Sequence, residues 1–315
     1  MPCRILQHRW RKDSLFRLVA IWAGCWMFLC SWFGKPSTFA QLSPEARARQ
    51  WNLMKENFGS RWEGKTRWFS AGAQGASPMT EAMPSIYQLE FPHSTPELGT
   101  WRGWGVIKPG DTRVVPLSEA TVVDRTPGSA TFQFEGVGGR NSLRTDGDTW
   151  GAEVNFFHSG RRSGLVLYFK DGKPNTIMSM AFRSMPISND GNQTFVKTAD
   201  FTAEPSDSIQ ESYAQPEMPL LKSSVKCTRR FSLDACHKLS STEQAGVSWR
   251  ETEEALYYVA GLPDLVYLKV PKSLSPGAKL GFACDFRPIG GPLRSLSVCF
   301  QDVGLCQWIC EDFVD

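Results

Sequence analysis

Alternation of apolar and polar residues over residues 150–156 constrains the fold of this chain more than any other feature. Every second side chain from Trp150 to Phe156 is apolar, while Glu153 and Asn155 belong to the intervening set. Successive side chains of a β-strand point to opposite faces, so this pattern predicts a strand with one apolar and one polar face.

Two further strands are predicted directly after it, over residues 165–170 and 177–183. The pair Asp171-Gly172 lies between them and favours a tight hairpin turn. Three consecutive antiparallel strands form a meander. Upstream, a helix is predicted over residues 44–57, after the N-cap candidate Ser43. The sequence therefore predicts an all-β fold with one short N-terminal helix.

The meander recurs near the C-terminus. Cys284 follows Val154 by 130 residues and, after one inserted residue, Leu296 follows Leu165 by 131. Such an internal repeat indicates a duplicated β unit of about 130 residues, and the body of the chain has room for two of them.

A basic and then apolar leader occupies residues 1–40. Residues 18–33 are uncharged, and small side chains follow at Thr38 and Ala40, which is the order of a cleavable export signal. An uncleaved signal-anchor is the alternative, with membrane contact through residues 15–34. Its apolar run would rise only about 24 Å as a helix, which is short of the hydrocarbon core of a bilayer. A leader without a targeting role is the third interpretation.

The rest of the chain is close to neutral. The leader holds six of the 35 Lys and Arg residues and one of the 32 Asp and Glu residues. Residues 41–315 therefore lack the basic excess typical of nucleic-acid binding. Arg161 and Arg162 are expected at a hairpin tip, either as solvated residues or as a contact for an anionic partner. No HExxH, Walker-type, GxSxG or CxxC motif occurs, so no catalytic residue and no metal ligand is assigned.

Cysteines cluster in the last 89 residues, which hold six of the nine. An even number in an exported domain favours disulfides, whereas the alternative is that some are small buried strand residues. Cys299 and Cys306 flank a predicted turn at Asp302 and could face each other across a hairpin. The disulfide candidates are Cys227, Cys236, Cys284, Cys299, Cys306 and Cys310.

Two parts of the chain resemble known proteins. In residues 51–64, the end of the predicted helix is followed by Gly59 and Trp62, which resembles the start of a lipocalin-like (calycin) barrel. Blocks within residues 274–313 resemble the C-terminal run of a tandem calycin family of unknown function, found in cyanobacteria and plastid-bearing eukaryotes. The spacing from Gly to Trp is one residue longer than the usual lipocalin pattern, and no clear Gly–Trp start precedes the second unit.

The resemblance implies two tandem calycin-like antiparallel barrels, over residues 41–190 and 191–315. It implies a non-catalytic, exported or membrane-associated protein of a plastid or thylakoid. Such a protein would bind an apolar ligand, either a pigment or a lipid, or assist assembly of a membrane complex. The alternative is a structural subunit that docks on a membrane complex and whose barrels are filled with side chains. A lyase or isomerase is a third class, and no cofactor is expected beyond the non-covalent pigment or lipid.

The first barrel is the better candidate for a ligand site, because its strands carry more aromatic residues and no cysteine. Its strand faces would line one cavity, or else interdigitate and leave none. We expect Trp62 to plug the closed end, next to Gly59, with Arg183 covering it. The expected ligand-lining residues are Trp150, Val154, Phe156, Leu165, Leu167, Phe169, Tyr168 and Arg183.

Overall fold

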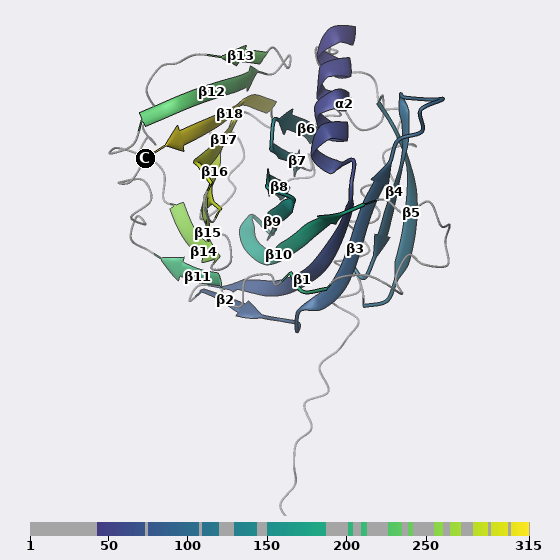
Figure 1. Ribbon diagram of the computed structural model, residues 1–315. Helices are drawn as coiled ribbons and strands as arrows, with labels where there is room; N and C mark the ends of the chain where they lie inside the picture. The colour runs from purple at the N-terminus through teal and green to yellow at the C-terminus, as the bar shows by residue number, and fades with distance from the viewer. Residues whose placement is uncertain are drawn as a thin grey trace, which may run out of the picture. The chain divides into compact units, whose positions relative to one another are not determined.

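The computed structural model shows a mostly β protein with one helix in its described part (Figure 1). It describes residues 43–72, 75–106, 109–119, 129–143, 150–186, 201–203, 209–212, 226–234, 239–241, 255–260, 265–271, 280–288, 291–301 and 304–314. The leader lies outside these ranges and stays a prediction. Within them, no helix is long and apolar enough to span a membrane.

Helix α2 (Pro44–Phe58) begins where the sequence predicts. The Ser43 hydroxyl caps it by accepting a hydrogen bond of 3.2 Å from the Ala46 amide. Trp51, Met54 and Phe58 form its apolar stripe, and all three are buried. The predicted helix is therefore confirmed, both in its start and in the face it buries.

A large curled antiparallel sheet follows the helix. Its strands pair in the order β5-β4-β3-β1-β10-β9-β8-β7-β6. They are β1 (Arg61–Gly72), β3 (Met83–Glu90), β4 (Leu98–Trp104), β5 (Thr112–Ser118), β6 (Ser129–Phe134), β7 (Val137–Leu143), β8 (Trp150–His158), β9 (Arg161–Lys170) and β10 (Lys173–Met185). Among the described residues β5 and β6 do not pair with each other, so this sheet is a half-barrel.

The C-terminal strands form a second antiparallel sheet, in the order β13-β12-β18-β17-β16-β15-β14-β11. They are β11 (Ile209–Ser212), β12 (Lys226–Asp234), β13 (Leu239–Ser241), β14 (Ala255–Ala260), β15 (Leu265–Pro271), β16 (Leu280–Arg287), β17 (Leu293–Gln301) and β18 (Gly304–Val314). The short β2 (Gly75–Pro78) pairs with the end of β1 and, through Ala76, with Ile209 of β11. It links the two sheets.

The two sheets share the register that the sequence repeat predicts. Val154 pairs with Leu165 across β8 and β9, and Cys284 pairs with Leu296 across β16 and β17. The last strand of each meander then pairs with the first long strand of its own sheet, β10 with β1 and β18 with β12. The duplication of the β unit is therefore visible in strand pairing as well as in sequence.

Two hairpin turns set the ends of the meander strands. Asp171 and Gly172, with φ of 50° and 69°, form the predicted turn between β9 and β10. Ser159 and Gly160, with φ of 46° and 71°, form an equivalent turn before β9. Because this turn takes only two residues, β9 starts at Arg161, four residues earlier than the sequence predicts.

Helix α2 covers the edge of β6 with amide side chains in place of another strand. The Gln50 side chain accepts a hydrogen bond of 2.7 Å from the Gln133 backbone amide and donates one of 3.0 Å to the Gln133 carbonyl. Asn57 donates to the Phe134 and Val137 carbonyls and to the Gln133 side chain, and it accepts from the Gly136 amide. The helix thereby satisfies backbone groups that an edge strand would otherwise leave without partners.

We expect Asn57→Ala to lower the free energy of unfolding by about 2–4 kcal/mol, because several buried hydrogen bonds are lost at one position. Asn52→Ala is the matched control: Asn52 lies on the exposed side of the same helix and should change stability by less than about 0.5 kcal/mol. Urea denaturation of both variants measures the difference. Equal stabilities of the two variants would contradict the edge-covering role of Asn57.

The apolar face of the β6–β9 strands packs against the second sheet. The Phe156 and Phe286 rings stack with centroids 4.6 Å apart. Beside them, Arg294 forms an ion pair of 2.9 Å with Asp312 and donates from Nη1 to the Gly136 carbonyl at 3.1 Å. The two sheets therefore bury this face between them.

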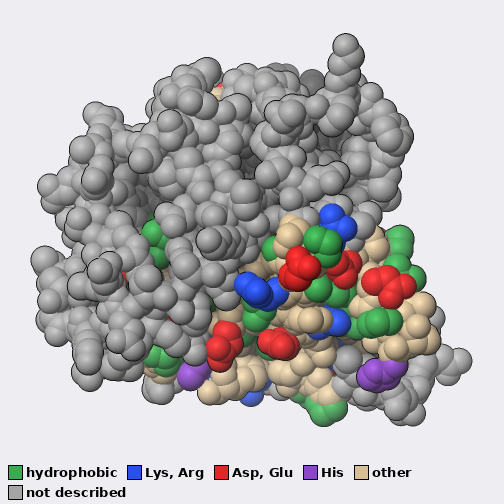
Figure 2. All heavy atoms as spheres, turned by 90° about the horizontal axis from the view of Figure 1, so that it is seen from above, with side chains coloured by type: hydrophobic (Ala, Val, Ile, Leu, Met, Phe, Trp, Pro, Cys, Tyr) green, Lys and Arg blue, Asp and Glu red, His purple; other side chains and the backbone are tan. Residues whose placement is uncertain are grey.

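The described part of the face seen in Figure 2 carries acidic and basic side chains close to one another, with apolar ones between them. Among the described residues, the exposed large apolar side chains are Met79, Leu98 and Val114. Met79 follows β2, and the other two lie on β4 and β5, where Leu98 and Val114 are separated by four residues of register.

Candidate functional site

One face of the large sheet is concave, and strand pairing defines its members. Arg162 of β9 pairs with Phe182 of β10, and Trp62 of β1 pairs with Tyr87 of β3. Three strand spacings separate β9 from β3, which is about 14 Å in a flat sheet. The Arg162 Cζ atom nevertheless lies 4.2 Å from the centre of the Tyr87 ring. The sheet must therefore curl toward this face, which we call the concave face; the opposite one is the convex face.

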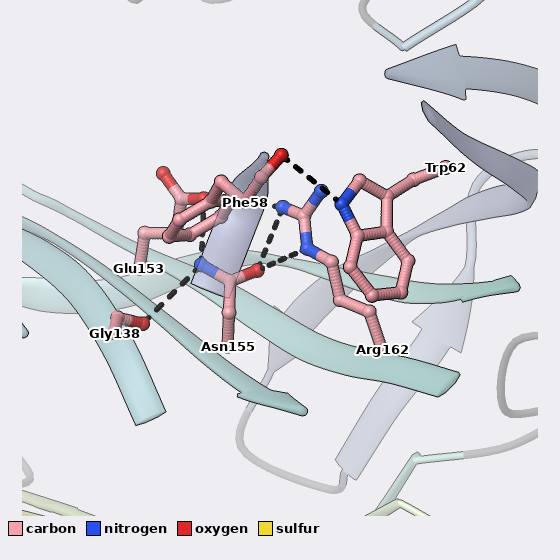
Figure 3. A network of polar contacts seen from close by, with 6 residues as sticks. All are labelled: Phe58, Trp62, Gly138, Glu153, Asn155 and Arg162. Atoms are coloured by element: carbon pink, nitrogen blue, oxygen red, sulfur yellow. Dashed lines mark hydrogen bonds and ion pairs between the residues drawn. The ribbon is translucent and has the colours of Figure 1, made fainter. Parts of the chain in front are cut away.

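Arg162 is the centre of a polar network on the concave face (Figure 3). Its Nε and Nη2 atoms donate to Asn155 Oδ1 at 2.9 and 2.7 Å. The Asn155 amide donates in turn to Glu153 Oε1 at 2.9 Å and to the Gly138 carbonyl at 3.4 Å. Glu153 Oε1 is also 3.6 Å from Arg162 Nη2, which makes an ion pair. Only 1% of Arg162 is exposed, so the fold holds a guanidinium in its interior.

Aromatic rings surround the same guanidinium. The Arg162 Cζ atom lies 5.1 Å from the Phe58 ring centre and 5.2 Å from that of Phe182, in addition to the Tyr87 contact. A cation over a ring face is attracted by the ring quadrupole, most strongly where water is excluded. The Phe58 carbonyl also accepts a hydrogen bond of 3.4 Å from the Trp62 indole. The end of α2 thus brings Trp62 and Arg162 into contact with one residue.

The electrostatics of the network follow from burial. Burial lowers the pKa of the Arg162 guanidinium, and interactions with Tyr87 and with the Glu153 carboxylate oppose that change. Burial likewise raises the pKa of the Tyr87 phenol, which keeps it neutral. An arginine stays charged in proteins, so this face carries a permanent buried positive charge.

Trp62 is buried, as the sequence predicts for a plug, whereas Arg183 lies away from it. Trp62 is 4% exposed, and its ring lies 5.5 Å from that of Phe157. Arg183 is exposed and pairs in register with Glu63, on the convex face. The expectation that Arg183 covers Trp62 is therefore wrong. Trp62 pairs with Ser184, and the adjacent residue Arg183 lies on the opposite face of the sheet.

The expected ligand-lining residues are divided between the two faces. Tyr168 lies on the concave face, where its ring stacks on Trp68 with centroids 6.2 Å apart. The backbone of Trp150 pairs with Phe169, while its side chain lies outside the described part of the chain. The apolar members are buried on the convex face and share it with Phe156, which stacks on Phe286 of the second sheet. These convex-face residues are Val154, Phe156, Leu165, Leu167 and Phe169.

Two of the disulfide candidates can be placed with their side chains. Cys284 and Cys310 are buried thiols, and each pairs in register with Leu296 of the strand between them. Two strand spacings, about 9.6 Å, separate them, which exceeds the Cα separation of a disulfide. The side chains of Cys227, Cys236, Cys299 and Cys306 lie outside the described residues, so disulfides elsewhere in this domain stay a prediction.

The sequence does not single out Arg162, Asn155 and Glu153 as a site. Arg162 was expected at a hairpin tip, whereas the two-residue turn places it inside β9. One signal was present: Glu153 and Asn155 occupy the polar face of a strand. Their placement on the concave face depends on the curl of the sheet, which a single strand does not encode. Among the described residues, no group of three or more His, Cys, Asp or Glu side chains could hold a metal ion.

No protein-family profile matches the chain, and no curated protein matches it. A solved structure is similar in fold: a protein of unknown function from the DUF3598 family of the cyanobacterium Nostoc punctiforme. The two superpose with a TM-score of 0.54 over 84% of this chain and 99% of that one, at 15% sequence identity. At this identity the likeness shows the fold alone, so the chain is similar in fold to a DUF3598-family protein.

Proposed function

We propose that this chain is a non-catalytic, lipocalin-like protein that binds one apolar molecule, a pigment or a lipid, on the concave face of its first sheet. In this proposal each sheet belongs to a calycin-like barrel, and the two barrels are in tandem. The leader sends the chain to a membrane or exported compartment, with a thylakoid as the proposed location. The cyanobacterial source of the structural neighbour supports that location.

The observation that carries the proposal is the composition of the concave face. Trp68, Tyr87 and Phe157 line it and are only half-buried, although both chain neighbours of Tyr87, Ile86 and Gln88, are buried. Ligand sites are concave, mostly apolar and aromatic, and hold a few fixed polar groups. The Arg162 network supplies such polar groups beside the half-buried rings.

The structural-subunit alternative also has an observation in its favour. Phe58, Trp62 and Phe182 fill one end of the concave face, and each is at most 5% exposed. A ligand on this face would therefore lie beyond that plug, toward Trp68 and Tyr168. A subunit with filled barrels would hold none.

Titration of the full chain with the neutral fluorescent probe N-phenyl-1-naphthylamine separates the two functions. We expect saturable binding, and we expect Trp68→Gln to weaken it about fivefold because a ring that contacts the probe is removed. Trp104→Gln is the matched control. Trp104 is also half-buried but lies on the convex face, in register with Ile86, and its removal should leave the affinity unchanged. No saturable binding by a folded protein would overturn the binding proposal.

A further inference from the structure

Two arginines lie side by side on the convex face, at the end of the sheet where β8 turns into β9. Arg161 of β9 pairs in register with Arg183 of β10, so both side chains project from the same face. Side chains paired in this way have Cβ atoms about 5 Å apart, and like charges at that separation destabilise a sheet. Neither guanidinium group forms a hydrogen bond or an ion pair with another described residue. The described residues therefore hold two adjacent positive charges and supply no partner for them.

The strands on either side of the pair do not neutralise it. Glu63 of β1 pairs in register with Arg183. Its carboxylate forms an ion pair with Arg61 of the same strand, and the Glu63 side chain is 3% exposed. On the side of β8, Arg161 pairs in register with His158, which adds no negative charge. Because Arg61 and Glu63 balance each other, the charges of Arg161 and Arg183 remain in excess.

The pair is accessible from solvent. Arg183 is exposed and Arg161 is half-buried, and the turn residues Ser159 and Gly160 beside them are exposed as well. Met185 follows Arg183 by two residues, so it lies on the same face, and it is half-buried. The turn carries no bulky side chain, so a broad surface can approach this end of the sheet and reach both arginines.

The chemistry of the pair favours an anionic lipid surface as the partner. Guanidinium groups bind phosphate and carboxylate oxygens through two donors at once. A nucleic acid would require a longer track of basic residues, and the chain outside the leader is close to neutral. An anionic membrane presents phosphate and carboxylate groups across a plane, and each basic residue near it strengthens binding about fivefold. A half-buried apolar side chain such as Met185 suits the headgroup region of the same surface.

We propose that Arg161 and Arg183 dock the convex end of the first sheet on an anionic lipid surface. The docking site is separate from the proposed ligand site, because the two lie on opposite faces of the sheet. The inference therefore goes beyond the proposed binding function and does not depend on it. Docking requires no change of conformation, since both arginine side chains already reach solvent.

Co-sedimentation with vesicles tests the proposal on residues 39–315, which form one compact unit and omit the basic leader. Vesicles of phosphatidylcholine are compared with vesicles that also contain about 30% phosphatidylserine. We expect binding to the anionic vesicles alone. Arg161→Gln and Arg183→Gln should each weaken it about fivefold, because one positive charge is lost.

Lys170→Gln is the matched control, because it removes the same charge from an exposed position at the opposite end of β9. That position is about 30 Å away along the strand, which is well beyond the Debye length in physiological salt. The affinity of this variant should stay unchanged. Equal weakening by Lys170→Gln would show attraction by net charge and would overturn the assignment to the arginine pair. Absence of binding to anionic vesicles by the folded protein would overturn the docking proposal.

Two further measurements separate loss of contact from loss of fold. Arg161→Glu places an opposite charge in register with Arg183, so it should abolish vesicle binding without lowering the urea midpoint. Retained binding in this variant would contradict the proposal. On the full chain, anionic vesicles should slow the modification of Arg161 and Arg183 by phenylglyoxal, and neutral vesicles should not. Equal modification rates with both kinds of vesicle would overturn the proposal even if residues 39–315 do not fold without the leader.

Discussion

Arg162→Ala is expected to lower the free energy of unfolding by about 3–5 kcal/mol, which is the cost of removing one partner from a buried ion pair. The substitution takes away both hydrogen bonds to Asn155 Oδ1 and the counter-charge of Glu153. It also leaves a space between the Phe58, Tyr87 and Phe182 rings. Urea denaturation followed by circular dichroism measures the loss.

The neighbouring arginine provides a control for this effect. Arg161→Ala should change stability by less than about 0.5 kcal/mol, as is usual for residues outside a buried network. Arg162→Lys should fall between the two, because lysine keeps the charge but not the planar donor arrangement that meets Asn155. An Arg162→Ala protein within 1 kcal/mol of the wild type in the same experiment would show that the network contributes little to folding.

The sequence predicted the strands and their faces well because a strand is a local structure. The alternation at Trp150 to Phe156 and the turn residues Asp171 and Gly172 are readable from neighbouring positions alone. The register of the repeat was also accessible, since the equivalent pairs Val154–Leu165 and Cys284–Leu296 keep their spacing. Local periodicity therefore accounts for the meander and for its duplication.

Local periodicity does not show which face of each strand becomes the concave face of the sheet. The apolar face of β8 suggested a lining for an apolar cavity, but it is the convex face that is covered by the second sheet, with Phe156 against Phe286. The polar face, with Glu153 and Asn155, lies on the concave side. Both assignments depend on how the sheet curls and on what covers it, and these depend on contacts between residues far apart in the chain, such as Arg162 with Tyr87 and Phe156 with Phe286. Arg162 was misplaced for a more local reason: a two-residue turn with positive φ at Ser159 was not expected.

The Arg162 network and the α2 edge contacts together hold helix α2 against one end of the concave face. Gln50 and Asn57 fix the helix to β6 and to the β6–β7 turn. Phe58, at the end of the same helix, then contacts both the Arg162 guanidinium and the Trp62 indole. The helix thus closes one end of the concave face, and the proposed ligand would enter from elsewhere. Substitutions at the α2 edge should therefore affect stability more than ligand affinity.

Trp62→Ala is expected to lower the free energy of unfolding by about 3–5 kcal/mol, the range for removing a large aromatic side chain from a core. Trp62 is 4% exposed, its ring lies against Phe157, and its indole donates to the Phe58 carbonyl. Trp62→Phe should cost less, because it keeps a ring beside Phe157 and loses only the hydrogen bond and part of the volume. Trp104→Ala, at a half-buried position of the convex face, is the matched control and should cost about 1–2 kcal/mol. If the Trp62 and Trp104 variants unfold at the same urea concentration, Trp62 does not plug the closed end, and the plug would no longer mark the limit of the proposed ligand site.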